Sequence, residues 1–542
     1  MKYKLFALAL FMNIMYLNSL SQPVIKAQKV AGGNDADDFT DMWLTKDRGL
    51  IVGGYSNSDK SAEKSQNSRG GYDYWVIKYD SCLRIEWGKT IGGNNDDDLY
   101  ALQQTQDGGY FLGGLSYSDS SYEKTQNSRG LSDCWIVKLN ANGKIQWDET
   151  IGGDYYDYLT CLQQTSDEGY ILGVVSESDS SGEKTENSRG SADYWIVKLD
   201  KTGKIQWDKT IGGNDDDEIR SLKQTSDGGY IVGGYSRSEP SGEKTQNCRG
   251  GFDYWIVKLD KLGNIEWTKT IGGNKDDYLT SVQQTNDGGY ILGGYSSSNI
   301  SAEKTQNNRC GCDADFSPDF WIVKLDASGQ IEWDKTIGGS NWDFLRSIQQ
   351  TSDDGYVMSG SSYSDISGEK TENGRGFGDY WIVKLDTKGE VQWDKTVGGN
   401  NQDEARSIKE VRKNIYAVGG FSLSDVSGDK SKRSRGFYDY WMVGLKYEEP
   451  SPSITSLESA DSLIASKSHN KNFSVYPNPV QNVVNIRING KATLTLTDLS
   501  GKILLTKTLE GNGEINVSHL SAGLYYLKNN STGETKKVII SR

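Results

Sequence analysis

One unit repeats seven times along the middle of the chain, and this repetition constrains the fold more than any other feature of the sequence. A tryptophan in the phrase Asp-Tyr-Trp-Ile-Val-Lys-Leu-Asp, or in a close variant of it, marks each copy. The copies lie 60 residues apart, except for one interval of 66, and their tryptophans are Trp75, Trp135, Trp195, Trp255, Trp321, Trp381 and Trp441. A repeat of this length is typical of propellers and solenoids.

Each copy contains four short apolar stretches with the composition of β-strands. In the copy that begins at Asp217 they cover residues 219–225, 230–236, 253–260 and 264–272. Gly-containing turns and one long polar loop separate the stretches, as expected for antiparallel hairpins. Four strands per copy in seven copies predict an all-β, seven-bladed β-propeller. We expect the first stretch to be the innermost strand, which places the long loops and the Gly-Gly loops on one face.

A second tryptophan follows the first by twelve residues in six copies. We predict that the two stand nearly opposite each other across the third turn, where they support cross-strand and blade-to-blade packing. The alternative, a platform for stacking sugars, is weaker because each tryptophan lies inside a strand. The second tryptophans are Trp87, Trp147, Trp207, Trp267, Trp333 and Trp393.

The two ends of the repeat region complement each other. The seventh copy stops after its third strand, near Leu445, and lacks the fourth strand with its Lys-Thr-Ile-Gly-Gly phrase. A similar phrase, Lys-Val-Ala-Gly-Gly, stands at residues 29–33. The N-terminal segment is therefore predicted to complete the last blade and to close the ring, which leaves no unpaired edge. An open solenoid would need capping repeats instead.

The N-terminus has the order of a secretory signal peptide. Lys2 and Lys4 precede an apolar run to about residue 17, and a small-residue pattern ends at Ser21. We predict a signal peptide over residues 1–21, with cleavage after Ala27 as an alternative site and an uncleaved membrane anchor as the alternative reading. No other segment is apolar and long enough to cross a membrane.

The predicted domains follow from these boundaries. The propeller covers residues 28–446. A Ser-rich segment with Pro450 and Pro452 forms a linker over residues 447–470. A second β-rich domain covers residues 471–542.

One turn of the repeat resembles a known family. Residues 199–207, Leu-Asp-Lys-Thr-Gly-Lys-Ile-Gln-Trp, are similar to the Asp-x-x-Thr-Gly-x-x-x-Trp turn of the PQQ-type quinoprotein propellers. The resemblance covers about ten residues per blade. It implies the architecture and does not imply the cofactor, so no cofactor is expected.

The C-terminal domain resembles the type A sorting domain of type IX secretion cargo, a family found in Bacteroidetes. The residues that carry this resemblance are Tyr-Pro-Asn-Pro at 476–479, Gly-Leu-Tyr-Tyr at 523–526 and a Lys-rich last strand at 536–540. The family implies a small immunoglobulin-like sandwich that directs the chain to an outer-membrane translocon. It also implies removal of the domain and attachment to a surface glycolipid. The expected location is therefore outside the cell or on its surface, by way of the periplasm. An ordinary β-sandwich module is the alternative.

Composition excludes several classes of function. The net charge is −14, and an acidic chain does not favour nucleic acid, which binds clustered Lys and Arg. The two histidines, His469 and His519, both lie near the C-terminus. The repeat region therefore has no histidine for a catalytic triad or a His-ligated metal.

Charged residues recur at the same places in all seven copies. An Asp follows the Gly-Gly pair, at positions 37, 97, 157, 217, 277, 343 and 403. An Arg precedes the third strand, at positions 69, 129, 189, 249, 309, 375 and 435. Another Asp stands just before the first tryptophan, at positions 73, 133, 193, 253, 319, 379 and 439, and a Lys also recurs, from Lys64 to Lys430.

A group repeated in every blade favours a structural role, in which Arg–Asp pairs fix the long loops. The functional alternative is a ring of Asp and Arg at the propeller mouth that binds a polar ligand, a glycan or a cation.

The fifth copy departs from the repeat and is the first candidate for a special site. Six extra residues surround Cys310-Gly-Cys312, and Cys248 occupies a nearby position in the equivalent loop of the fourth copy. We expect a disulfide between Cys248 and either Cys310 or Cys312 in an exported protein. The candidate ligand loops contain Asp277, Arg309, Asp313 and Asp315. Calcium is a weaker alternative at Asp-rich loops, because no Asp-x-Asp-x-Asp-Gly spacing appears.

These observations favour an exported, non-enzymatic binding protein whose ligand is a polysaccharide or a protein. A secreted glycosidase or lyase is one alternative and would need paired carboxylates in an asymmetric pocket. A purely structural surface component is the other. Type IX secretion machinery is the expected partner of the C-terminal domain.

Overall fold

The computed structural model describes residues 22–310, 316–448, 473–476, 480–488, 490–498, 502–532 and 535–541. All regular structure in these ranges is β-strand, and they hold no helix long and apolar enough to span a membrane. The chain forms two compact units, Met1–Ser451 and Pro452–Arg542. The predicted signal peptide and most of the predicted linker lie outside the described residues.

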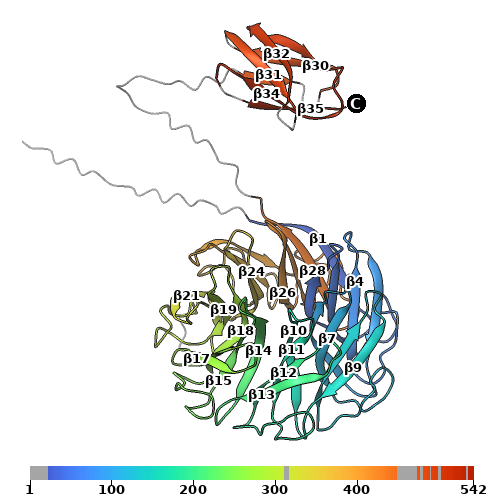
Figure 1. Cartoon of the computed structure of the whole chain (residues 1–542), viewed down its shortest axis with the longest axis vertical. Helices are drawn as coiled ribbons and strands as arrows, with labels where there is room; N and C mark the ends of the chain where they lie inside the picture. The colour runs from blue at the N-terminus through green and yellow to red at the C-terminus, as the bar shows by residue number, and fades with distance from the viewer. Residues whose placement is uncertain are drawn as a thin grey trace, which may run out of the picture. The chain divides into compact units, whose positions relative to one another are not determined.

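The first unit is a ring of seven four-stranded antiparallel sheets, which confirms the predicted propeller (Figure 1). The innermost strands are β2 (Asp37–Leu44), β6 (Asp97–Gln104), β10 (Asp157–Gln164), β14 (Asp217–Gln224), β18 (Asp277–Gln284), β22 (Asp343–Gln350) and β26 (Asp403–Arg412). The second strands are β3 (Leu50–Ser56), β7 (Tyr110–Ser116), β11 (Tyr170–Ser176), β15 (Tyr230–Ser236), β19 (Tyr290–Ser296), β23 (Tyr356–Ser362) and β27 (Ile415–Ser422).

The remaining strands complete each blade outward. The third strands are β4 (Asp73–Tyr79), β8 (Asp133–Leu139), β12 (Asp193–Leu199), β16 (Asp253–Leu259), β20 (Asp319–Leu325), β24 (Asp379–Leu385) and β28 (Asp439–Lys446). The outer strands are β5 (Ile85–Ile91), β9 (Ile145–Ile151), β13 (Ile205–Ile211), β17 (Ile265–Ile271), β21 (Ile331–Ile337), β25 (Val391–Val397) and β1 (Val24–Ala31). The third strands are buried along nearly their whole length, because a neighbouring blade covers each of their faces.

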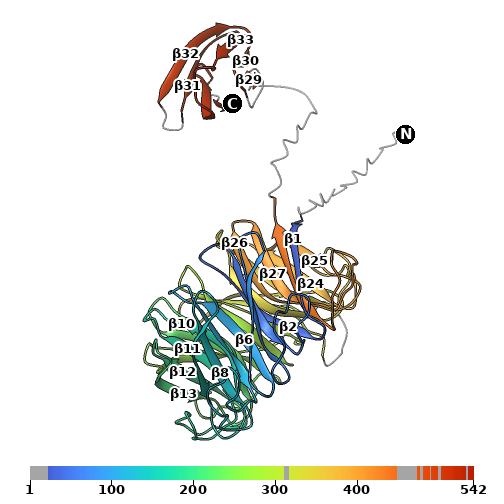
Figure 2. The same ribbon diagram turned by 90° about the vertical axis from the view of Figure 1, so that its right-hand side faces the viewer.

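The N-terminal strand closes the ring, as the sequence predicts. β1 is the outer strand of the last sheet, whose order is β1-β28-β27-β26 (Figure 2). It pairs antiparallel with β28 over seven residue pairs, from Val24 with Lys446 to Ala31 with Tyr440. Val30 and Ala31 are almost fully buried, so the two ends of the propeller share one hydrophobic core.

The first tryptophan of each blade packs against the preceding blade. The rings of Tyr74 and Trp135 lie 5.0 Å apart, and the Tyr74 hydroxyl donates a hydrogen bond of 2.8 Å to the carbonyl of Trp135. The Trp135 indole N–H donates to Asp148 at 3.0 Å. These contacts satisfy the polar atoms of large buried aromatics, which otherwise would be costly to bury.

The predicted pairing of the two tryptophans within a blade is wrong. Trp195 stands opposite Thr210, and Trp207 stands opposite Lys198. Each tryptophan is the third residue of its strand, and antiparallel pairing places the third residue of one strand against the far end of the other. The second tryptophan instead contacts the following blade, as in the pair of Trp87 and Tyr110, whose rings are 5.5 Å apart. The prediction of blade-to-blade packing is therefore confirmed for both.

The C-terminal unit consists of two antiparallel sheets. Their strand orders are β29-β30-β33 and β32-β31-β34-β35. The strands are β29 (Phe473–Tyr476), β30 (Val483–Ile488), β31 (Lys491–Thr497), β32 (Ile503–Glu510), β33 (Gly513–Asn516), β34 (Gly523–Asn529) and β35 (Thr535–Ile540). Both sheets contribute residues to one core, among them Ile486 and Leu494.

Candidate ligand-binding site

The seven innermost strands surround a central cavity of about 410 Å³. Each of these strands contains a β-bulge; in β6 the pairing shifts between Leu99 and Ala101. A bulge turns two successive side chains toward the same face. Three or four residues of each inner strand therefore line the cavity.

We name the layers of side chains along the channel by their most distinctive residues. The arginine tier consists of Thr40, Tyr100, Thr160, Arg220, Thr280, Arg346 and Arg406. The bulge tier consists of Asp41, Ala101, Cys161, Ser221, Ser281, Ser347 and Ser407. The lysine tier consists of Trp43, Gln103, Gln163, Lys223, Gln283, Gln349 and Lys409.

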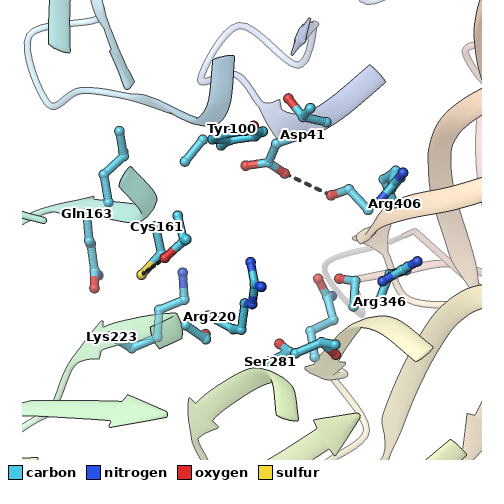
Figure 3. Close-up of a pocket in the computed structure, with 18 of the residues that line it drawn as sticks. Asp41, Tyr100, Cys161, Gln163, Arg220, Lys223, Ser281, Arg346 and Arg406 are labelled. Carbon is cyan, nitrogen blue, oxygen red and sulfur yellow. Dashed lines mark hydrogen bonds between the residues drawn. The ribbon is translucent and has the colours of Figure 1, made fainter. Parts of the chain in front are cut away.

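The cavity breaks the symmetry of the repeat. The arginine tier carries Thr in three blades and Arg in three others, and the lysine tier carries Gln in four blades and Lys in two. Five cationic side chains thus line the cavity, together with the carboxylate of Asp41. Figure 3 shows Arg220 and Lys223 extending from β14 into the same open space.

Glutamate side chains hold the arginines in place. Arg220 Nη2 lies 2.5 Å from Glu218 Oε2, and its Nε donates to the Tyr235 hydroxyl at 3.2 Å. Arg346 and Arg406 share Glu404, with Nε to Oε1 distances of 3.1 and 3.2 Å.

Glu404 is ionised in this arrangement. Burial raises the pKa of the Glu404 carboxyl, but Arg406 and Arg346 outweigh burial and hold the pKa below its ordinary value. The carboxylate therefore positions two guanidinium groups toward the channel.

The two lysines of the cavity have no such partner. Among the described residues, neither the Lys223 nor the Lys409 ammonium has a hydrogen bond or an ion pair. The Lys409 Nζ lies 5.8 Å from the centre of the Trp43 ring. Burial lowers the pKa of Lys223, and the nearby positive charge of Lys409 lowers it further. Cys161 and Asp41 act on Lys223 in the opposite direction, without outweighing burial and Lys409. The lysine tier therefore holds two cationic groups that repel each other and that form no ion pair among the described residues.

The cavity opens through a mouth lined by tyrosines. A pocket of about 380 Å³ shares the arginine tier with the cavity and adds Tyr158, Tyr235 and Tyr295. Tyr278 extends this aromatic cluster, with ring centres 4.8 Å from Tyr235 and 5.1 Å from Tyr295. Aromatic faces beside cationic groups form a surface suited to a polar ligand that contains rings.

The Asp that follows each Gly-Gly pair is structural. All seven of these side chains are fully buried. Asp217 Oδ2 accepts hydrogen bonds from the Gly213 N–H at 2.6 Å and the Ser238 hydroxyl at 3.0 Å. The second Gly of the pair is required because a Cβ on Gly213 would overlap Ser238. These carboxylates hold the interblade loop and do not line the channel.

The recurring arginines join each blade to the next. Their guanidinium groups pair with an acidic residue in the long loop of the following blade at 2.6–2.9 Å. The pairs are Arg69–Glu123, Arg129–Glu183, Arg189–Glu243, Arg249–Glu303, Arg309–Glu369, Arg375–Asp429 and Arg435–Glu63. The last pair crosses the closure of the ring, so the seven ion pairs form a complete circle.

The prediction that these arginines fix the long loops through Asp needs correction. The Asp before the first tryptophan accepts a hydrogen bond from the arginine backbone N–H, as Asp73 does from Arg69 at 2.6 Å. The guanidinium itself points to the neighbouring blade. The recurring lysines are also buried, and Lys304 Nζ lies 5.0 Å from the centre of the Trp321 ring.

Two candidate residues of the fifth copy, Asp277 and Arg309, do not line the channel. Asp277 is fully buried, and burial raises its pKa to about 6. Arg309 pairs with Glu369. Asp313 and Asp315 lie outside the described residues. A ligand site in this loop stays a prediction.

The predicted disulfide of Cys248 is not formed in the structure. Cys248 is a free thiol, whereas Cys310 is disulfide-bonded, and Cys312 lies outside the described residues. The Cys248 thiol points into its own loop, where it donates to the carbonyls of Ser236 at 3.1 Å and Ser238 at 3.4 Å. It replaces a serine that has the same role in other blades, such as Ser68.

In the described part of the chain, no group of three or more His, Cys, Asp or Glu side chains is placed to hold a metal ion. Asp313 and Asp315 lie outside the described residues, so the calcium hypothesis stays untested for their segment.

The cationic residues of the cavity are not among the site residues predicted from the sequence. An alignment of the seven copies contains the signal, because Arg replaces Thr and Lys replaces Gln at two positions of the innermost stretch. The signal becomes meaningful only when the bulge shows that these positions face the channel.

Two curated proteins are similar to parts of the chain. A 230-residue segment is 24% identical to the regulatory protein FlaEY of Caulobacter vibrioides and covers 38% of this chain and 23% of that protein. A 248-residue segment is 25% identical to colossin-A of Dictyostelium discoideum and covers 42% of this chain and 2% of that protein. The chain thus matches less than a quarter of the length of either relative.

Solved structures similar to the chain include several propellers. The Pan2 WD40 domain of Neurospora crassa aligns with a TM-score of 0.40 and 10% identity, over 77% of this chain and 90% of that one. The PQQ-bound aldose sugar dehydrogenase of Streptomyces coelicolor aligns with a TM-score of 0.30 and 10% identity, over 79% and 100%. Values this low carry no information about ligand or activity.

The match to a family model is confined to the C-terminal unit. It covers residues 474–541, which include strands of both sheets of that unit. It indicates export by a type IX secretion system to the cell surface or beyond. Residues 474–541 match the family model of the secretion system C-terminal sorting domain.

Proposed function

We propose that this chain is an exported, non-enzymatic binding protein that takes its ligand into the central channel of the propeller. The observation that supports the proposal is the asymmetric arginine tier. The blades repeat one another closely in their cores, yet three of them carry Arg where three others carry Thr. A feature that breaks a repeat inside a cavity is expected where a single ligand must be recognised.

The surroundings of Arg220 favour binding over support. A guanidinium group stabilises the ring when it bridges two inner strands, as Arg346 of β22 does with Glu404 of β26. Arg220 instead pairs with Glu218 of its own strand, β14, and so does not join two blades. Its contribution to the fold is correspondingly small, because an ion pair with partial exposure contributes about 0–1 kcal/mol.

An enzyme is the second candidate, and Asp98 is the residue that favours it. Burial raises the pKa of Asp98 to about 7, and Asp96, Asp97 and Asp38 add to the effect. Asp98 stands two residues before Tyr100 of the arginine tier, and a carboxyl group with this pKa is suited to general acid catalysis. The channel has no described histidine, so a lyase or glycosidase would depend on this group.

A glycan and surface-protein array with the purified full chain tests the proposal. The matched variant is Glu218→Tyr/Arg220→Thr, which gives β14 the Tyr and Thr present at the same places in β10 and β18. It removes an arginine without leaving its carboxylate unpaired, so the fold should survive; circular dichroism and thermal unfolding check this.

A selective hit that the variant loses supports the channel as the binding site. A hit that both proteins retain equally, or the absence of any hit, contradicts it. Turnover of a bound saccharide that Asp98→Asn abolishes would show an enzyme instead.

A further inference from the structure

The lysine tier presents hydrogen-bond donors to the cavity. The side-chain carbonyls of its glutamines are already used by the backbone of the next blade. Gln103 Oε1 accepts from the Gln164 N–H at 2.7 Å, and Gln163 Oε1 accepts from the Gln224 N–H at 2.7 Å. Gln283 makes the same contact with the Gln350 N–H at 3.1 Å. A backbone N–H can donate only to the amide oxygen, so the orientation of these amides is determined.

Three glutamine amide NH₂ groups of this tier are left without an acceptor among the described residues. They belong to Gln103, Gln163 and Gln283. The fourth glutamine differs: in the orientation that satisfies both of its groups, Gln349 Nε2 donates to the Ile408 carbonyl at 3.2 Å. Together with the two lysines, five of the seven side chains of the tier offer donors that lack partners.

Unpaired ammonium groups in a cavity are unusual in this chain. Elsewhere in the propeller, the buried lysines have a hydrogen-bond or ion-pair partner; Lys198 Nζ lies 2.9 Å from Asp167, and Lys184 Nζ donates to the Ser178 carbonyl at 2.7 Å. Burial is the main cause of the lowered pKa of Lys223, and repulsion from the Lys409 ammonium lowers it further. A bound anion relieves both the repulsion and the lack of acceptors.

The one carboxylate that lines the cavity does not provide this anion. Asp41 accepts a hydrogen bond from the Ser407 hydroxyl at 3.0 Å, the dashed line at Asp41 in Figure 3. It also accepts one from the Met42 N–H at 2.8 Å. It belongs to the bulge tier. Its charge acts on Lys223 without outweighing burial and the charge of Lys409, and neither lysine forms an ion pair with it. The chain has a net charge of −14, so a shortage of acidic residues does not explain the absence of a partner.

We infer that the lysine tier is an oxyanion-binding site and that the ligand of the channel is an acidic saccharide. The inference rests on the proposed function, because the ligand must enter the channel. A carboxylate, sulfate or phosphate group lies between Lys223, Lys409 and the glutamine amides. The arginine tier and the Tyr-lined mouth contact the rest of the ligand.

The lining selects the saccharide class. Hydroxyl and amide side chains from Thr, Ser and Gln predominate in the three tiers, and they suit a ligand rich in hydroxyl groups. Trp43 and the tyrosines of the mouth supply flat faces on which sugar rings pack. A cavity of about 410 Å³ has the size of a small-molecule site.

Isothermal titration calorimetry with the full chain tests the inference. The probes are tri-galacturonate, a sulfated galactose trisaccharide, neutral galactotriose and inorganic sulfate. The variants are Lys223→Gln and Lys409→Gln, alone and together, because Gln is the native residue at this position in four other blades. Lys261→Gln, which removes an exposed charge from an outer turn, is the control.

We expect an acidic trisaccharide to bind and each lysine variant to weaken binding on the order of 10-fold, as expected for the loss of one charged hydrogen bond. The double variant should lose most of the salt dependence, and Lys261→Gln should change nothing. Carboxylate and sulfate probes separate the two sources of the oxyanion. Equal binding of inorganic sulfate and the acidic trisaccharides would overturn the saccharide part of the inference.

Failure of the inference is distinguishable from failure of the proposed function. If an acidic trisaccharide or an acidic array hit binds and the lysine variants bind it equally well, the oxyanion site is overturned while a channel ligand remains. If no array compound and no probe binds the wild-type chain, both are overturned.

Discussion

Removal of the N-terminal strand should open the propeller. A chain that lacks residues 22–31 loses β1 and its seven residue pairs with β28. At about 1 kcal/mol for each backbone hydrogen bond, the pairing contributes roughly 7 kcal/mol. Burial of Val30 adds about 2 kcal/mol. The strand no longer has to be ordered, which offsets part of this loss, and a net loss of several kcal/mol is expected. A typical domain has only 5–15 kcal/mol of stability.

Thermal unfolding measures this loss, and we expect a decrease in Tm of roughly 10 °C. The exposed edge of β28 should also promote association between copies. A synthetic peptide of residues 22–33 should restore the Tm by adding back the missing strand, whereas the same peptide with Val30→Asp should not. An unchanged Tm after the deletion, or no recovery with the native peptide, would refute the argument that β1 closes the ring.

The remaining predictions concern the ion-pair circle, pH and export. Arg129→Ala breaks one interblade pair whose side chains are 28% and 27% exposed, and should lower the free energy of unfolding by only about 0.5–1 kcal/mol in chemical denaturation; a loss above 3 kcal/mol would contradict this. Burial raises the pKa of Asp73 and Asp253 to about 7, so the folded state binds more protons than the unfolded state. The Tm should therefore fall as the pH rises from 5 to 8. Asp253→Asn should flatten this slope, and a higher Tm at pH 8 would disprove the sign. Deletion of residues 471–542 should leave the chain in the periplasm, as fractionation and immunoblotting would show; normal export of the truncated chain would contradict the role of the sorting domain.

The pH prediction depends on groups that titrate in the same window. Burial lowers the pKa of Lys64 from 10.5 to about 8, so this lysine affects stability mainly above pH 8. Burial raises the pKa of Asp47, but hydrogen bonds from Lys78 and Thr45 outweigh burial and lower the pKa to about 2. The stability that Asp47 contributes is lost only below about pH 4. Between pH 5 and pH 8 the buried aspartates therefore dominate.

Register explains where the sequence analysis failed. The two tryptophans of a blade are twelve residues apart, which suggested that they face each other across a turn. Antiparallel pairing instead places Trp195 against Thr210, because both tryptophans stand near the start of their strands. Spacing alone does not determine which residues of a hairpin are opposite.

The disulfide prediction failed for a related reason. Cys248 and Cys310 are close in the alignment of the copies. The direction of a side chain is set by its loop, and the Cys248 thiol points inward to the carbonyls of Ser236 and Ser238. Proximity in the repeat does not bring two sulfur atoms together.

The sequence by itself determined the number of blades, the four strands of each blade and the closure by the N-terminal strand. These features follow from periodic patterns, in which the same local interactions occur seven times. It also determined the sorting domain, through motifs confined to the last 70 residues or so. Only the tertiary structure decided which side chains meet in the channel. Arg220, Lys223 and Lys409 come from strands far apart in the chain, and a bulge in each inner strand turns their positions toward the axis. Closure of the ring then brings unpaired charges together, which no pattern along a single copy can show.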